Sequence, residues 1–379
     1  MSIPFNKPYL TGKETHYIED AVKSGKISGN GIYTQKCQDF FEKKYGFKKA
    51  LLTTSCTDAL EMAAILADLK EGDEVIVPSF TFVSTAIAFI RQRAKIVFAD
   101  SYSDNPNMDA DKIESLITTK TKAIVPVHYA GVACDMDKIM ALASKYNLLV
   151  IEDAAQAIDS FYTSKDGSVK ALGSIGHLAA FSFHETKNIV SGEGGMLAIN
   201  DEQFIHRAEI IWEKGTNRAE FFRGEINKYG WVDIGSSFLP SEVISAFLWA
   251  QIENIEDIQL KRIQLWNTYY EGLNKLELKK IKLPTIPDFA TNNGHMFYIC
   301  LENIEQREKL IALLKQNGFH AVFHYISLHS STYYNDKHDG RKLVNSDNFT
   351  NTLLRLPMFY ELNETDIITI VQLIQKFHD

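Results

Sequence analysis

One lysine in this chain has a setting that suits covalent chemistry. Lys187 closes the segment 181–187 (FSFHETK), which continues the apolar run 178–181 and precedes the glycine-rich segment 192–195 (GEGG). The apolar run predicts a buried strand, which would carry the lysine stem out of the core and direct its amine into a cavity. A partly desolvated amine loses its proton more readily and attacks carbonyl groups to form a Schiff base. A solvated lysine in a surface turn is the competing interpretation, and most lysines are of that kind.

A carboxylate at the end of another apolar run is the second chemical element. Residues 148–151 (LLVI) have the length of a strand and lead directly into Glu152, Asp153 and the small residues 154–155. Ligands of open α/β sheets bind outside the carboxyl ends of the strands, where we expect Asp153. A carboxylate there could pair with the protonated pyridine nitrogen of pyridoxal phosphate, which needs that proton to act as an electron sink. Capping of the following helix explains Asp153 equally well.

Taken together, three segments resemble the core motifs of the sugar-nucleotide aminotransferases of the DegT/StrS type. They are 151–156 (IEDAAQ), 181–187 (FSFHETK) and 192–195 (GEGG), and the resemblance extends over nearly the whole chain. It implies a fold-type-I enzyme with pyridoxal 5'-phosphate as cofactor, Lys187 as the residue that binds it covalently and Asp153 as the partner of its ring nitrogen.

The resemblance also implies a reaction. Glutamate would donate an amino group to a dTDP-4-keto-6-deoxyhexose, giving a dTDP-4-amino-4,6-dideoxyhexose for O-antigen or lipopolysaccharide synthesis. Amination at C4 is favoured over C3 by the match of segments 127–134 (VHYAGVAC) and 214–218 (KGTNR). Whether the new amine is axial or equatorial stays open.

Further cofactor contacts follow from a strand–turn–helix pattern over residues 51–62. The free backbone N–H groups and the positive end of the helix dipole favour an anion at its start, although simple capping is the commoner use of such residues. In the family this turn is usually Ser-Gly-Thr and holds the cofactor phosphate; here Cys56 replaces the glycine. The cofactor contacts that the resemblance implies are Ser55, Cys56, Thr57 and Ser182 at the phosphate, Phe82 against the ring and Gln156 near its hydroxyl.

A basic and aromatic stretch in residues 214–229 is expected to serve the substrate. Arginine and lysine suit a diphosphate and aromatic rings suit a nucleotide base, although an ordinary surface loop has a similar composition. Ser237 stands where relatives carry an asparagine that reaches the cofactor phosphate of the neighbouring subunit, so we expect at least a homodimer with shared sites. The residues assigned to substrate are His184, Lys214, Arg218, Lys228, Tyr229, His324 and Tyr325.

Strands that alternate with helices must position these residues. Strand patterns at 74–78, 94–100, 123–129 and 148–153 predict an α/β fold with a mostly parallel sheet flanked by helices. No G-x-G-x-x-G segment opens a helix, which argues against a nucleotide-binding dehydrogenase. Residues 240–273 have long helical periodicity and would bridge to a smaller C-terminal α+β domain. We therefore expect a large cofactor-binding domain at 1–250 and a small domain at 251–379.

Composition excludes several other classes. The chain has 379 residues and a net charge of −8 without long charge runs, so no nucleic-acid partner is expected. It has no apolar segment long enough to cross a bilayer and no signal-peptide pattern at its start. Four widely spaced cysteines predict free thiols in a reducing cytoplasm. His295, His324 and His329 lack nearby carboxylate and cysteine partners, so no metal site is predicted.

Several functional alternatives share these patterns. A 3-keto-sugar nucleotide aminotransferase would use the same site, whereas a pyridoxamine-dependent sugar dehydratase carries histidine at the position of Lys187. A non-catalytic cofactor-binding sensor would need an effector module, for which the chain has no residues to spare. His128, at a predicted strand end, is expected to be structural, with a role in the site as the minority alternative.

Overall fold

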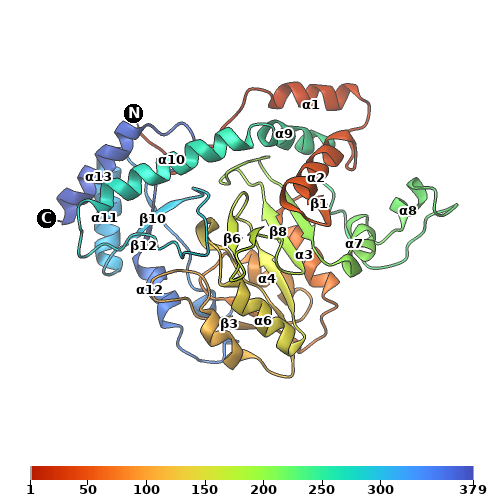
Figure 1. The fold of residues 1–379 in the computed structure, drawn as a ribbon, viewed down its shortest axis with the longest axis horizontal. Helices are drawn as coiled ribbons and strands as arrows, with labels where there is room; N and C mark the ends of the chain where they lie inside the picture. The colour runs from red at the N-terminus through yellow and green to blue at the C-terminus, as the bar shows by residue number, and fades with distance from the viewer. Residues whose placement is uncertain (1, 379) are drawn as a thin grey trace.

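The computed structural model describes residues 2–378, and its centre is a seven-stranded sheet (Figure 1). Strand β9 runs antiparallel to both of its neighbours. All other strand pairs in this sheet are parallel. The expected mostly parallel α/β architecture is therefore confirmed. In spatial order the strands are β1 (Lys49–Thr53), β9 (Gly195–Ile199), β8 (Leu178–Ser182), β5 (Leu149–Asp153), β4 (Thr121–Ile124), β2 (Glu74–Pro78) and β3 (Lys95–Ala99).

Helices cover both faces of this sheet because the strand side chains are apolar on both sides. Neighbours such as Leu51 and Leu52 are both about 1% exposed but belong to different cores, as alternation along a strand requires. One core receives α3 (Cys56–Leu66), α4 (Ser84–Ile90) and α7 (Ile205–Trp212). The other receives α2 (Ile32–Tyr45), α6 (Met136–Tyr146), α9 (Glu242–Ile252) and the start of α10 (Ile255–Asn274).

A smaller unit is built around a three-stranded antiparallel sheet in the order β10 (Phe297–Cys300), β12 (Leu353–Leu356) and β11 (Val322–Phe323). Its own core packs α10, α11 (Ile304–Gln316) and α13 (Glu364–His378) against that sheet. The first residues of the chain join this unit, since Ile3 forms a bridge with Phe319. We propose that the boundary between the large and the small domain lies at residue 250.

The remaining elements are short or peripheral. Helix α1 (Glu14–Lys23) lies alongside α9 at the edge of the molecule, and α8 (Arg218–Phe222) stands away from the body (Figure 1). The others are α5 (Ala110–Ile113), α12 (Val344–Thr352) and the hairpin of β6 (Phe161–Thr163) and β7 (Val169–Ala171).

Two expectations about elements are corrected. The strand predicted to reach residue 129 ends at Ile124, because Pro126 lacks an N–H group; Val127 then forms a single bridge with Asp153. The long helical segment 240–273 is two helices, which separate at Glu253 and Asn254.

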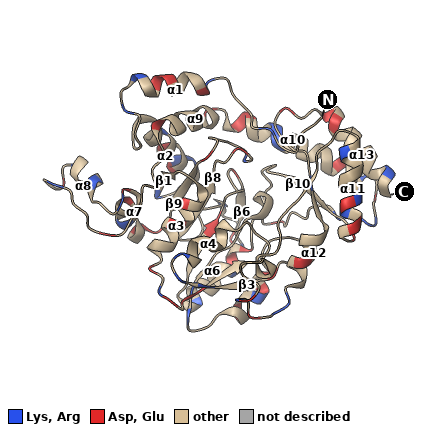
Figure 2. Ribbon diagram, turned by 180° about the vertical axis from the view of Figure 1, so that it is seen from behind, with Lys and Arg blue, Asp and Glu red and all other residues tan. Residues whose placement is uncertain are grey.

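Acidic and basic side chains are interspersed along the chain (Figure 2). Within residues 2–378, no helix combines the length and apolarity needed to span a membrane. The same residues hold no group of three or more His, Cys, Asp or Glu side chains arranged to bind a metal ion.

Candidate active site

A cavity of ≈ 750 Å³ lies between the carboxyl ends of the central strands and the small sheet. Its large-domain wall includes the start of α3, the end of β5 and the loop after β8. Its other wall includes the segment 295–296 and strands β11 and β12, while Phe5 and Asn6 reach it from the start of the chain. A cavity of this size, into which polar side chains converge, is typical of a small-molecule site.

Lys187 lines this cavity from the loop that follows β8. The loop is held by its own backbone: Phe183 N–H donates to the Gly194 carbonyl, and Lys187 N–H donates to the His184 carbonyl at 2.9 Å. Burial is the main cause that lowers the pKa of the Lys187 amine, and the nearby Arg355 cation lowers it further, whereas Cys56 and Asp153 act in the opposite direction. The amine of Lys187 is therefore more readily converted to its neutral, nucleophilic form than the amine of an ordinary lysine.

Asp153 ends β5 and lines the same cavity, with only 5% of its surface exposed. The Thr85 hydroxyl donates to its Oδ2 at 2.6 Å, and the Ala155 N–H donates to its Oδ1 at 3.2 Å. Burial nevertheless raises the pKa of this carboxyl, with those two hydrogen bonds and Lys187 opposing the shift. A cationic N–H group placed in the cavity would stabilise the ionised form.

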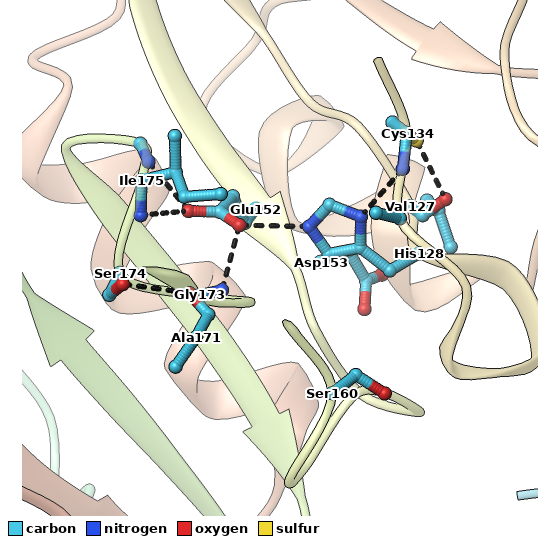
Figure 3. A network of polar contacts seen from close by, with 12 residues as sticks. Val127, His128, Cys134, Glu152, Asp153, Ser160, Ala171, Gly173, Ser174 and Ile175 are labelled. Carbon is cyan, nitrogen blue, oxygen red and sulfur yellow. Dashed lines mark hydrogen bonds and ion pairs between the residues drawn. The ribbon is translucent and has the colours of Figure 1, made fainter. Parts of the chain in front are cut away.

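The residue before Asp153 anchors β5 on the other side of the strand (Figure 3). Glu152 is fully buried and accepts hydrogen bonds from Gly173 N–H at 2.7 Å, Ile175 N–H at 2.8 Å and Gly176 N–H at 2.6 Å. Its Oε2 also lies 2.8 Å from His128 Nε2. His128 Nδ1 accepts from Cys134 N–H at 3.2 Å, so the ring proton belongs on Nε2 and is donated to Glu152. His128 does not line the cavity, and its structural role stays a prediction.

The start of α3 forms a cradle for an anion. Ser55 caps the helix by accepting from Asp58 N–H at 3.1 Å, and the first N–H groups of a helix lack partners within it. Strand β9 approaches this turn so closely that a Cβ at Gly195 would lie 2.4 Å from the backbone nitrogen of Cys56. Glycine is required there because any side chain would collide with the backbone of Ser55 and Cys56.

The small-sheet wall is linked to the large domain by hydrogen bonds among polar side chains. Gln156 accepts from Ala130 N–H at 2.7 Å through Oε1 and donates through Nε2 to the Tyr325 hydroxyl at 3.0 Å. His324 Nδ1 lies 2.8 Å from the Tyr129 hydroxyl. Burial lowers the pKa of His324 well below its usual range, so this histidine is neutral. These contacts fix the side chains of Gln156, His324 and Tyr325, which line the cavity.

The structure gathers most of the sequence-predicted residues in this cavity and leaves others outside it. Lining it are Ser55, Cys56, Thr57, Phe82, Asp153, Gln156, Ser182, His184, Lys187, His324 and Tyr325. Outside it, on the segment 213–237 that we term the arm, are Lys214, Arg218, Lys228, Tyr229 and Ser237. The roles assigned to these residues stay predictions.

Three residues that sequence reasoning missed also line the cavity. Thr85 supports Asp153, and His295 Nδ1 lies 2.8 Å from the Asn188 amide oxygen, next to Lys187. Arg355 lies in β12 within the apolar run 353–356. A charged residue in a run of strand length was a usable signal for Arg355. His295 was considered only as a metal ligand, and no local pattern distinguishes Thr85.

The fold and the presence of a half-buried lysine and a strand-end aspartate in one cavity define a fold-type-I, pyridoxal-phosphate-dependent aminotransferase. The chain belongs to the DegT/DnrJ/EryC1/StrS aminotransferase family, whose model matches residues 8–375. GDP-perosamine synthase of Escherichia coli O157:H7 is 30% identical over 99% of this chain and 98% of its own length.

Solved structures agree with this assignment. DesV of S. venezuelae, solved in complex with a ketimine intermediate, has a TM-score of 0.90 and 26% identity, covering 100% of this chain and 99% of DesV. The PLP form of Spr1654 from Streptococcus pneumoniae shares the fold with a TM-score of 0.89 at 23% identity, covering 100% and 99% of the two chains. Pyridoxal phosphate is the cofactor of the family.

The residues present fit that cofactor. Ser55, Cys56 and Thr57 line the cavity at the start of α3, where a phosphate can accept from backbone N–H groups, and Gly195 lets β9 pack against this turn. Burial raises the pKa of the Asp153 carboxyl, and a protonated pyridine nitrogen would supply the counter-ion for its ionised form. Lys187 supplies an amine whose lowered pKa suits reaction with an aldehyde.

Proposed function

We propose that this enzyme transfers the amino group of glutamate to a nucleotide-linked 4-keto-6-deoxyhexose, with amination at C4. The observation that carries the proposal is the convergence of Lys187 and Asp153 in one cavity of ≈ 750 Å³, which leaves space for a substrate beside the cofactor. Glutamate is oxidised to 2-oxoglutarate and the keto carbon is reduced to an amine. The water consumed in the first half-reaction is released in the second, so no external oxidant or reductant is needed.

The cofactor, when bound, supplies an electron sink for the carbon that gains or loses nitrogen. The chain supplies the proton transfers and the placement. Lys187 is the base that removes the proton from the donor carbon and later returns one to the sugar carbon, a role that suits an amine with a lowered pKa. Asp153 holds the proton on the ring nitrogen, and Thr85 fixes the orientation of that carboxylate.

The nucleotide is proposed to be dTDP because the resemblance over nearly the whole chain implies a dTDP-linked sugar, and segments 127–134 and 214–218 support the choice of C4. The E. coli relative named for a GDP-linked sugar favours a second candidate, the corresponding GDP-linked 4-keto-6-deoxyhexose. The product amine then serves the synthesis of a surface polysaccharide, and a cytoplasmic location stays a prediction. Turnover measured with the dTDP- and the GDP-linked substrates, each with glutamate, decides between them; activity with neither contradicts the proposal.

A homodimer with shared sites is the proposed assembly, supported by the arm. The arm stands away from the body and carries exposed apolar side chains, among them Phe222 at 65% and Trp231 at 84% exposure (Figure 1). Arg218 packs its guanidinium over the rings of Phe222 and Tyr229, 5.0 and 5.9 Å from their centroids. Exposed apolar surface of this kind marks an interaction site. We propose that the arm completes the partner's site, where Arg218 and Lys228 bind the diphosphate and Ser237 approaches the cofactor phosphate.

A further inference from the structure

A buried histidine outside the cavity joins the two walls of the active site. His329 lies in the loop 324–343, which connects β11 to α12, and it is 8% exposed. Its Nδ1 lies 2.7 Å from the hydroxyl oxygen of Ser79, and its backbone N–H donates to the same oxygen at 3.4 Å. The Leu328 N–H donates to the Ser79 carbonyl at 2.9 Å. Three contacts therefore hold together segments that lie 250 positions apart in the sequence.

Each side of this contact leads directly to residues that line the cavity. Ser79 follows β2 and precedes Thr81 and Phe82, which belong to the large-domain wall. His329 shares its loop with Tyr325, which lines the opposite wall. Tyr325 has a φ of 42°, in the left-handed region that a tyrosine rarely adopts. Such a backbone persists only while the surrounding contacts hold it, so the loop is expected to relax when the contact with Ser79 opens.

The hydrogen-bond pattern requires the neutral form of His329. Ser79 has no exposed surface, and among residues 2–378 the Nδ1 of His329 is the only acceptor that its hydroxyl reaches. Nδ1 therefore accepts from Ser79, which puts the ring proton on Nε2, 3.5 Å from a carboxylate oxygen of Asp347. Protonation of Nδ1 would turn this acceptor into a donor and leave the buried Ser79 hydroxyl without a partner.

The charged and titratable groups around His329 act in both directions. Asp347 on α12 and Asp100 after β3 favour the protonated imidazole, whereas His338 and Arg341, both on the same loop, oppose it. The side chain of Asp347 is 47% exposed, so solvent screens its charge. Burial is the main influence, and it lowers the pKa of His329. The docked loop therefore takes up a proton less readily than an exposed histidine does.

We propose that the Ser79–His329 contact is a proton-sensitive latch, which holds the two walls of the cavity together while the imidazole is neutral and loosens the loop 324–343 when it is protonated. Because the docked form has the lower pKa, docking is fully favoured above the ordinary histidine value of 6.5 and weakens as the pH falls below it. One pH unit below that value, linkage allows a loss of up to about 10-fold in the docking equilibrium.

Hydrogen–deuterium exchange of the enzyme loaded with pyridoxal phosphate tests the latch. It needs no substrate, so its outcome is independent of the proposed function. Mass spectrometry follows peptides that cover residues 327–335 between about pH 7.5 and about pH 5.5, a range that spans the titration of histidine. Protection is corrected for the intrinsic pH dependence of exchange, with peptides of α6 as the internal reference, and reports how often the segment opens.

Two variants of His329 separate the titration from the hydrogen bond. In His329→Asn the amide oxygen takes the place of Nδ1 as an acceptor but does not titrate. In His329→Leu the acceptor is lost. The matched control is His338→Gln, because the ring of His338 lies 5.0 Å from that of His329. Its Nε2 donates to the Arg341 carbonyl at 2.8 Å, a bond that glutamine can keep.

Protection in the wild type should fall several-fold across this range, with about 10-fold as the ceiling, and His338→Gln should behave in the same way. His329→Asn should keep its protection throughout, and His329→Leu should be poorly protected at every pH. The rate at which pyridoxal phosphate dissociates from the wild type, divided by the rate for His329→Asn, should rise below pH 6.5. Groups elsewhere in the site titrate alike in both proteins and cancel in this ratio.

Four results would overturn the latch. Constant protection of the wild type across the range means that no titration controls the loop. An equal loss in His329→Asn assigns the effect to another group, and acid sensitivity that disappears in His338→Gln assigns it to His338. A ratio of cofactor dissociation rates that does not change with pH means that the contact does not shape the active site.

Discussion

His128 and Glu152 form a buried pair, with 2.8 Å between Nε2 and Oε2 and no exposed surface on either side chain. Glu152 directly precedes Asp153 in the sequence. The backbone N–H of His128 donates to the backbone carbonyl of Asp153 at 3.2 Å. The same histidine therefore holds both the backbone of Asp153 and the carboxylate that precedes it. This links the packing behind the sheet to the orientation of the cofactor partner.

Replacing His128 with glutamine is expected to loosen Asp153 as well as the fold. Removing the imidazole leaves the fully buried Glu152 carboxylate short of a donor, at a cost of about 3 kcal/mol in unfolding free energy. We also expect weaker binding of pyridoxal phosphate, because Glu152 is held less firmly and the adjacent Asp153 shifts with it, although the backbone bond from residue 128 to Asp153 is kept. Urea unfolding of the apoprotein and a titration with the cofactor measure the two effects separately.

His206→Gln is the matched control for this variant, since His206 is 70% exposed and pairs with Glu220 at the surface. Its unfolding free energy should change by less than about 0.5 kcal/mol. Destabilisation of His128→Gln with unaltered cofactor affinity would mean that the pair supports only the fold.

The amine of Lys187 should titrate below the ordinary lysine value of 10.5 in the apoprotein, since burial and Arg355 both lower its pKa. Asp153 opposes that shift, so Asp153→Asn should move the midpoint to still lower pH. Trace acetylation with acetic anhydride across a pH series, read by mass spectrometry of the peptide containing Lys187, gives the midpoint. The exposed Lys26 serves as an internal reference. An upward shift in Asp153→Asn would contradict the electrostatic account.

Gly195→Ala tests the anion cradle. The added Cβ would lie 2.4 Å from the Cys56 nitrogen, so the helix start must move. We expect a loss of about 1–3 kcal/mol in stability and a marked loss of cofactor retention during dialysis. Gly272→Ala is the control, because its Cβ would meet only the side chain of Val371 at 3.3 Å. If Gly195→Ala retains the cofactor as wild type does, the phosphate site lies elsewhere.

Mixed dimers test whether the arm serves the partner's site. Lys187→Ala and Arg218→Glu should each be inactive or nearly so as homodimers. Random mixing produces heterodimers that carry one site with both residues intact, so about a quarter of wild-type activity should return. Activity that stays at the level of the separate variants would place Arg218 and Lys187 in the same subunit's site or remove Arg218 from the site.

Buried strands and their carboxyl ends were predictable because apolar runs of strand length dominate this sheet. That is why Asp153 and Lys187 could be placed at one edge from the sequence. Contacts made across the domains were not predictable, because Arg355 reaches the cavity only through the register of the small sheet. The break between α9 and α10 was missed since Glu253 and Asn254 are tolerated within helices, so no residue marked the interruption.

Transfer of isotope from donor to sugar tests the central claim most directly. The enzyme, loaded with pyridoxal phosphate, is incubated with 15N-glutamate and the dTDP- or GDP-linked 4-keto-6-deoxyhexose, and the products are analysed by NMR and mass spectrometry. We predict 15N on C4 of the sugar with an equal amount of 2-oxoglutarate, and no label with Lys187→Ala. Unlabelled sugar from the wild-type enzyme with both substrates, or labelled sugar from Lys187→Ala, would contradict the account.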